Sequence, residues 1–312
     1  MNETIQTDVD LLGSARARRS LAPGDEILDG EESPREVLLL LAGAATIYAE
    51  TPFGPHPVAT LKAPTLLNLG RALGSSNDLF RIQPEGKGEA ATFGADEARG
   101  LLFDPSAAGQ AFRRLALSSI TAALRETNAS IKKFFDSISA NQIQSARDSG
   151  EIQAIGGQVP VNPEKVYDLL DAAGLNPSGL PDLGLLARHL PAEKTLVAAG
   201  TKGDEAYLLA EGKLRISIQI PGVGEEALAI LGPGEIVGEM SLVDDAPRSA
   251  DVRAHEGHAL VYVLSRTVFR QLLESGDPAG APLLAGITIA LTRRHEDSVR
   301  KAATFRVMAG PF

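Results

Sequence analysis

Apolar and polar residues alternate over part of the C-terminal half of the chain, and this pattern predicts β-strands. Leu214, Ile216 and Ile218 are separated by polar residues, which is the two-residue period of a half-buried strand. A Pro-Gly turn begins at Pro221, and apolar residues return over Ala227–Leu231, so the pair predicts a hairpin. Shorter apolar runs predict further strands over Ala206–Ala210, Ser249–Ala254 and Ala259–Leu264.

Two longer segments show a helical spacing of apolar residues instead. In Ala107–Ser145 and Leu283–Phe305 the apolar residues recur mostly three, four or seven positions apart, which predicts amphipathic helices. A helix over Arg266–Glu274 is expected directly after the last predicted strand. Shorter helices are predicted over Pro163–Ala173, with Asn162 as its cap, and over Asp182–His189.

The chain also matches itself weakly when it is shifted by about 170 residues. Tyr207 and the two leucines after it then fall on Val37 and its two leucines, and Gly200 falls on Gly30. This shift is too long for a solenoid repeat, so it predicts two copies of one domain, each followed by a long helix. Short strands separated by Gly and Pro are typical of a barrel or a double-sheet roll.

Composition narrows the classes of protein that remain. The 312 residues suggest about two domains, and the net charge of −10 argues against a dedicated nucleic-acid binder. The absence of Cys excludes disulfides and thiolate metal sites. The longest apolar run, Val37–Ala45, is far too short to span a membrane, and the start of the chain has no signal-peptide pattern. We therefore expect a cytoplasmic protein that binds neither nucleic acid nor membranes.

The charge is distributed in blocks along the chain. Residues 1–104 and 151–280 are acidic, whereas 105–150 and 281–312, which hold the predicted long helices, are basic. Basic helices that lie on acidic domains would explain this alternation, and so would basic helices that contact an acidic partner.

The most informative stretch begins at Gly238-Glu239-Met240-Ser241-Leu242 and ends at Arg248-Ser249-Ala250. It resembles the phosphate-binding cassette of cyclic-nucleotide-binding domains, the family of the catabolite activator protein and the protein kinase A regulatory subunits. In that family Gly-Glu, a small residue and Leu are followed, after a short spacer, by Arg, a small residue and Ala. The similarity extends over about Leu183–Glu274 and the helix that follows, and it implies a non-enzymatic domain that binds cAMP or cGMP without a further cofactor.

The resemblance also assigns a role to the cassette residues. A guanidinium such as that of Arg248 suits a cyclic phosphodiester, because its forked donors match the two exocyclic oxygens. Ser249 adds a hydroxyl donor, and the carboxylate of Glu239 can accept the hydrogen bond of the ribose 2′-OH. Gly238 allows close approach of the backbone, and the backbone around Ser241 favours an anion. The predicted ligand-binding residues are Gly238, Glu239, Met240, Ser241, Arg248, Ser249, Ala250 and Ser298.

The purine contact is less sharply defined than the phosphate contact. In the family a residue of the C-terminal helix, often from a partner subunit, can contact the base. Matching Arg293-Arg294 to a similar pair in the activator's helix places Ser298 at that position, with Thr292 as a second candidate. These residues do not separate adenine from guanine. We favour cAMP because it is the commoner ligand of such domains, although a hydroxyl after Arg248 is compatible with cGMP.

The first copy departs from the cassette pattern. At the shift of 170 residues, Gly238 falls on Asn68, Glu239 on Leu69 and Arg248 on Asp78. A carboxylate in place of the arginine would repel a phosphate. We therefore expect the first copy to keep the fold without binding a cyclic mononucleotide in the usual way, and to act in dimerisation or docking.

The predicted fold class is α+β, with two cyclic-nucleotide-binding-like β-rolls (double-sheet jelly-roll barrels), each flanked by α-helices. The predicted segments are a degenerate domain (1–104), a connecting helical segment (105–150), a linker with a short helix (151–182), a cyclic-nucleotide-binding domain (183–280) and a C-terminal helix (281–312).

The functional hypothesis is a cytoplasmic second-messenger receptor that forms a homodimer. No motif of a P-loop, a dinucleotide fold, a nucleophile elbow or a zinc protease is present, and only a few residues follow Phe305, where the activator family has its DNA-binding helices. Two alternatives stay open: a structural scaffold that binds no nucleotide, and a cyclic-dinucleotide receptor that uses Arg293 and Arg294. The downstream protein partner is not identified by the sequence.

Overall fold

The computed structural model describes residues 3–14, 16–29, 35–73, 80–137, 186–220, 224–274 and 280–309. The chain divides into two compact units. Unit 1 comprises Met1–Ser137 and Leu291–Phe312, and unit 2 comprises Ile138–Ala290. The last helix therefore begins in unit 2 and continues into unit 1. The boundaries predicted from the sequence stay a prediction, and the segment 151–182 lies outside the described residues.

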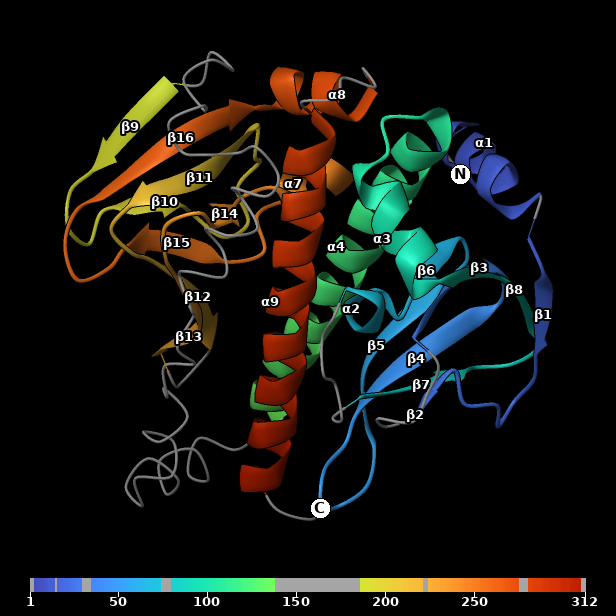
Figure 1. Cartoon of the computed structure of the whole chain (residues 1–312). Coiled ribbons are helices and arrows are strands. Elements are labelled where there is room, and N and C mark those ends of the chain that lie inside the picture. Colours follow the sequence, from blue (N-terminus) through green and yellow to red (C-terminus); the bar gives the residue numbers. More distant parts are fainter. Residues whose placement is uncertain are drawn as a thin grey trace. The chain divides into compact units, whose positions relative to one another are not determined.

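Unit 1 is built around two antiparallel four-stranded sheets (Figure 1). Their strand orders are β1-β8-β3-β6 and β2-β7-β4-β5. The strands are β1 (Arg18–Leu21), β2 (Leu28–Asp29), β3 (Glu36–Ala42), β4 (Ala44–Ala49), β5 (His56–Lys62), β6 (Thr65–Leu67), β7 (Phe80–Pro84) and β8 (Gly88–Gly94). The helices are α1 (Glu3–Gly13), α2 (Leu69–Ala72), α3 (Ala95–Phe103) and α4 (Ala107–Ser137).

Unit 2 repeats this plan. Its two antiparallel sheets have the orders β9-β16-β11-β14 and β10-β15-β12-β13. The strands are β9 (Leu186–Leu190), β10 (Thr195–Val197), β11 (Glu205–Glu211), β12 (Leu214–Ile220), β13 (Gly224–Leu231), β14 (Ile236–Val237), β15 (Asp251–Ala254) and β16 (Ala259–Ser265). The helices are α7 (Met240–Asp244), α8 (Arg266–Glu274) and α9 (Gly280–Ala309), the last of which continues into unit 1.

The two rolls correspond strand for strand. If the strands of each unit are numbered from one to eight along the chain, both units have the same two strand orders, 1-8-3-6 and 2-7-4-5. Local irregularities also recur, because the register shifts at Leu40 in β3 and at Leu209 in β11. Gly43 and Gly212 follow these strands, and both have a positive φ with backbone packed against the missing side chain. This agreement supports the internal duplication expected from the weak sequence match, and the fold class is confirmed.

The hydrophobic cores are mostly aliphatic, with a few buried phenylalanines. In unit 1, α4 packs on β5 and β6, and the hydroxyl of Ser119 accepts a hydrogen bond from the backbone of Leu66 at 2.7 Å. Phe93 and Phe112 pack ring against ring at 5.4 Å between α4 and the sheet. In unit 2 the alternating residues Leu214, Ile216 and Ile218 are all buried, which is the pattern expected for β12.

The predicted strands of unit 2 and the helix at Arg266–Glu274 are confirmed, and the two long helices are present as α4 and α9. The predicted helix over Asp182–His189 is wrong. Residues Leu186–Leu190 form β9, which pairs antiparallel with β16 from Leu190 opposite Ala259 to Leu186 opposite Val263. Pairing with a long neighbouring strand outweighs the weak helical preference of so short a segment. The short helix predicted at Pro163–Ala173 lies outside the described residues.

Within the parts of the chain that the structure describes, no helix combines the length and the apolar character needed to cross a membrane.

Candidate functional site

The cassette singled out in the sequence connects β14 to β15. Gly238 follows β14 with a φ of 81°, a backbone conformation that favours glycine. The short helix α7 then begins at Met240, and Asp245 ends it in the left-handed conformation with a φ of 57°. Arg248 lies in the extended stretch between α7 and β15. This path brings Arg248 back to the residue that opens the cassette.

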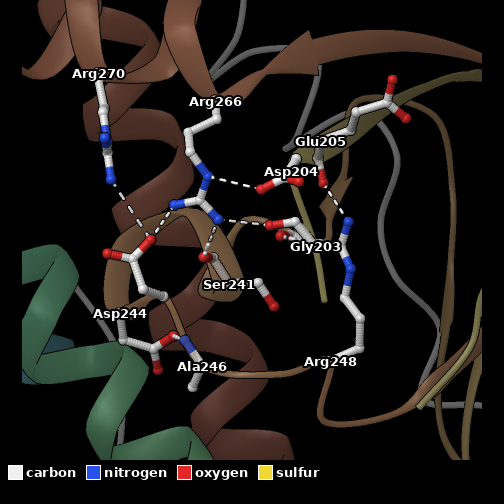
Figure 2. Close-up of polar contacts among 11 residues, drawn as sticks. Gly203, Asp204, Glu205, Ser241, Asp244, Ala246, Arg248, Arg266 and Arg270 are labelled. Atoms are coloured by element: carbon white, nitrogen blue, oxygen red, sulfur yellow. Dashed lines mark hydrogen bonds and ion pairs between the residues drawn. The ribbon is translucent and has the colours of Figure 1, made fainter. Parts of the chain in front are cut away.

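Arg248 is held by backbone carbonyls. Its Nη1 donates to the carbonyl oxygen of Gly238 at 2.6 Å. Its Nη2 donates to the carbonyl oxygen of Glu205, also at 2.6 Å (Figure 2). The residue is only 8% exposed. Both terminal nitrogens of the guanidinium thus donate to backbone carbonyls, and the planar group is held in one orientation.

Neighbouring side chains offset part of the cost of burying Arg248. Desolvation lowers the pKa of Arg248, while the side chains of Tyr207, Glu239 and Glu205 act in the opposite direction. A guanidinium has so high an ordinary pKa that it remains charged under these influences. The site therefore presents a fixed, partly desolvated positive charge.

The remaining predicted residues of the cassette gather at the same place. Glu239 is fully buried at 0% exposure, and Ser241 is buried on α7. Ser249 is an exposed residue, and its hydroxyl donates to the sulfur of Met240 at 3.9 Å. Ala250 is buried before β15. The structure thus brings together the seven cassette residues.

Ser298, the predicted purine contact, lies elsewhere in the chain. It is buried on the part of α9 that belongs to unit 1, as is Thr292, whereas the cassette belongs to unit 2. A contact of either hydroxyl with a ligand stays a prediction.

Sequence reasoning missed Arg266, the first residue of α8. Its guanidinium donates to the carbonyl oxygens of Gly203 at 2.6 Å and of Ser241 at 3.0 Å (Figure 2). It also forms ion pairs with Asp204 at 3.1 Å and with Asp245. Arg266 therefore joins the cassette helix, the loop before β11 and the start of α8. An arginine at the first position of a predicted helix was the only signal in the sequence.

A second missed group lies on β9 and β11. The hydroxyl of Tyr207 donates to Glu205 at 2.6 Å, and Arg188 donates to the same carboxylate at 3.1 Å. These hydrogen bonds lower the pKa of Glu205, and burial raises the pKa of Tyr207. Arg188 from β9 and Tyr207, two residues along β11, thus fix the side chain of Glu205, whose carbonyl holds Arg248.

Gly203 is a further residue that sequence reasoning missed. A Cβ atom at this position would overlap the guanidinium carbon and Nε of Arg248. Its φ lies outside the left-handed region, so the backbone alone does not require glycine. The absence of a side chain at Gly203 therefore serves the packing of Arg248.

The corresponding turn of unit 1 has a similar backbone conformation but different side chains. Asn68 has a φ of 65° where Gly238 has 81°, and its amide donates to the carbonyl of Glu36 at 2.7 Å. Leu69, a buried apolar residue, stands where unit 2 has Glu239. Asp78, aligned with Arg248, lies outside the described residues. The turn is thus a structural copy without the buried acid.

A family model described as "Cyclic nucleotide-binding domain" matches residues 187–275. A cyclic AMP receptor protein from Thermus thermophilus is 43% identical over 74 residues, which are 24% of this chain and 34% of that protein. An uncharacterized ABC transporter ATP-binding protein of Mycobacterium tuberculosis is 36% identical over 89 residues, which are 28% of this chain and 26% of that protein. The chain thus spans about a third or less of these relatives.

Among solved structures, the regulatory domain of Toxoplasma gondii PKA with cAMP is similar to 88% of this chain and 87% of its own, at 15% identity and a TM-score of 0.30. This TM-score is low, and the two rolls are defined by the sheet orders of the chain itself. The cassette geometry and the family match identify residues 187–275 as a member of the cyclic nucleotide-binding domain family.

Proposed function

We propose that the chain is a regulatory receptor that binds one cyclic nucleotide, with cAMP favoured over cGMP, in unit 2. The observation that carries this proposal is the buried guanidinium of Arg248, oriented by the carbonyls of Gly238 and Glu205. A group that is fixed before the ligand arrives loses little conformational freedom on binding.

Each cassette residue would contact a different part of the ligand. The N–H groups of Arg248 that the two carbonyls do not use would donate to the exocyclic phosphate oxygens, with Ser249 as an additional donor. The buried carboxylate of Glu239 would accept from the ribose 2′-OH. The similarity to a cyclic AMP receptor protein of Thermus thermophilus supports a cyclic mononucleotide as the ligand class.

The output we propose is a change at α8 and α9 that alters protein–protein contacts, including those of a homodimer. Arg266 supports this output, because it bonds the Ser241 carbonyl in the cassette and lies at the first position of α8. A ligand that binds one arrangement of this contact more tightly would shift the population of helix positions. The proposed receptor has no catalytic activity of its own and acts in the cytoplasm.

A thermal-shift screen with cAMP, cGMP and cyclic dinucleotides tests this function. A ligand in large excess over its dissociation constant must stabilise the folded chain, so cAMP at near-millimolar concentration is expected to raise the melting temperature. Stabilisation by cyclic dinucleotides alone would favour the dinucleotide receptor. No stabilisation by any of them would favour a scaffold that binds no nucleotide.

A further inference from the structure

A small cavity of about 50 Å³ lies in unit 1, at the turn that corresponds to the cassette. Asn68, Leu69 and Gly70 line one side of it, and apolar side chains of the roll and of α4 line most of the rest. Such a volume holds a few water molecules and no nucleotide. The first roll therefore has too little room for a nucleotide at this turn.

Three side chains of α9 close one side of this cavity. Thr292, His295 and Glu296 line the cavity, and they are only 4%, 5% and 7% exposed. His295 lies within 3.2 Å of the Thr127 hydroxyl on α4 and meets the ring of Phe80 edge-on at 6.1 Å between centroids. We call the packing of these three α9 residues at this turn the α9 seat.

Gly70 makes room for the carboxylate in the α9 seat. A Cβ atom on Gly70 would overlap Oε1 of Glu296 and would lie 3.3 Å from a methyl carbon of Thr292. Gly70 is on α2, which occupies the place of the cassette helix α7 in unit 2. An acidic side chain of the chain itself thus lies against the first roll's counterpart of the phosphate-binding helix.

The helix that supplies the α9 seat starts in the other unit. Gly280–Ala290 belongs to unit 2 and Leu291–Phe312 to unit 1, and α9 is continuous from Gly280 to Ala309. Its 30 residues correspond to about 45 Å of helix at 1.5 Å per residue. Phe305 extends the contact toward the end of the helix, with its ring 4.7 Å from that of Phe135. The same helix therefore carries residues of both units.

We propose that α9 is an internal ligand of the first roll, and that a cyclic nucleotide on unit 2 must release it. This inference rests on the proposed function, which supplies the cyclic nucleotide as ligand. The packing in the α9 seat is what the bound nucleotide would change. If the seated helix defines the ligand-free state, then the apparent affinity of unit 2 is reduced by the fraction of molecules in which α9 is seated. Weakening the seat should therefore tighten nucleotide binding at a distant site.

Gly70→Leu and the milder Gly70→Ala test this in the full chain, with Gly100→Leu as the matched control. Gly100 is also in a helix of unit 1, α3, and a Cβ atom there would meet nothing within 4 Å. Calorimetric titration with cAMP should show the dissociation constant of Gly70→Leu lowered by about threefold or more relative to Gly100→Leu. If Gly70→Leu fails to fold, as judged by circular dichroism, the same comparison is made with Gly70→Ala.

Amide hydrogen exchange measures the release of α9 independently of the dissociation constant. Peptides from residues 291–305 should exchange faster in the Gly70 variant without ligand, and in the wild type after cAMP is added. Normal cAMP binding with unchanged exchange and an unchanged dissociation constant would overturn the α9 inference alone. Absence of any binding heat in the wild type would overturn the proposed function, and the release by ligand with it.

Discussion

Arg248 Nη1 donates a hydrogen bond of 2.6 Å to the carbonyl oxygen of Gly238. This bond joins the arginine near the end of the cassette to the glycine that begins it. Glu205, the first residue of β11, supplies the second carbonyl, also at 2.6 Å. The guanidinium is therefore positioned by the backbone before any ligand binds. This preorganisation leads to the predictions that follow.

Arg248→Lys should weaken cAMP binding strongly. A lysine keeps the charge, but its ammonium cannot satisfy both carbonyls and also present forked donors to a phosphate. Loss of one or two charge-assisted hydrogen bonds corresponds to about 10- to 100-fold in the dissociation constant. Calorimetry measures this loss, and Arg253→Lys, at a 31% exposed side chain with ion pairs to Glu193 and Glu225, is the control. Equal affinities of the two variants would contradict the role of Arg248.

Gly203→Ala should reduce affinity without unfolding unit 2. The new methyl group would displace the Arg248 guanidinium, and the backbone at Gly203 does not need a positive φ. We expect about a tenfold weaker affinity for cAMP, which corresponds to about 1.4 kcal/mol. The control is Gly232→Ala, where a Cβ atom meets nothing within 4 Å. If the Gly203 and Gly232 variants bind equally well, the packing argument fails.

Arg266→Lys should lower both the stability and the ligand affinity of unit 2. Lysine cannot reach the carbonyls of Gly203 and Ser241 together while keeping its ion pair with Asp204. We expect a loss of about 1–3 kcal/mol, measured as a lower urea midpoint. Arg270→Lys is the matched control on α8, because Arg270 is 53% exposed and lies 3.5 Å from Asp245. A midpoint that is unchanged relative to this control would show that the Arg266 contacts are dispensable.

The fold was predictable from the sequence where patterns are local and regular. The alternation in Leu214–Ile220 specified β12, and the spacing of apolar residues specified α4 and α9. The strand β9 was not predictable, because Leu186–Leu190 becomes a strand only by pairing with β16. The weak repeat did indicate two copies of one domain, since glycines such as Gly212 recur where the backbone requires them.

The candidate site was predictable in its contiguous part only. The cassette from Gly238 to Ala250 is one segment, so its residue types could be read directly. Three further residues contact the cassette through backbone carbonyls and tertiary packing: Gly203, Glu205 and Arg266. Because every residue has a backbone carbonyl, the residue types in a sequence do not show which carbonyls take part. The insertion of Glu296 at Gly70 was likewise hidden, because it depends on where α9 packs.

His295 should make folding sensitive to acid. Burial lowers the pKa of His295 from 6.5 to about 4. Between these values the unfolded chain binds a proton that the folded chain does not, so stability falls as the pH drops from 6.5 and levels off below about 4. The loss is up to about 3 kcal/mol.

Urea unfolding followed by the helical circular dichroism signal at several pH values measures this loss. His295→Gln is the control, since glutamine can still bond the Thr127 hydroxyl and does not titrate. A wild-type midpoint that falls no more than that of His295→Gln over this pH window would contradict the assignment.

The central claim is that one of the two rolls binds a cyclic nucleotide and the other does not. Calorimetric titration of cAMP into the full chain tests it most directly, because the stoichiometry counts the competent sites. The cassette with its buried Arg248, and the first roll with too little room for a nucleotide, predict one cAMP bound per chain. Saturation at two per chain, or no binding heat with either cAMP or cGMP, would contradict this account.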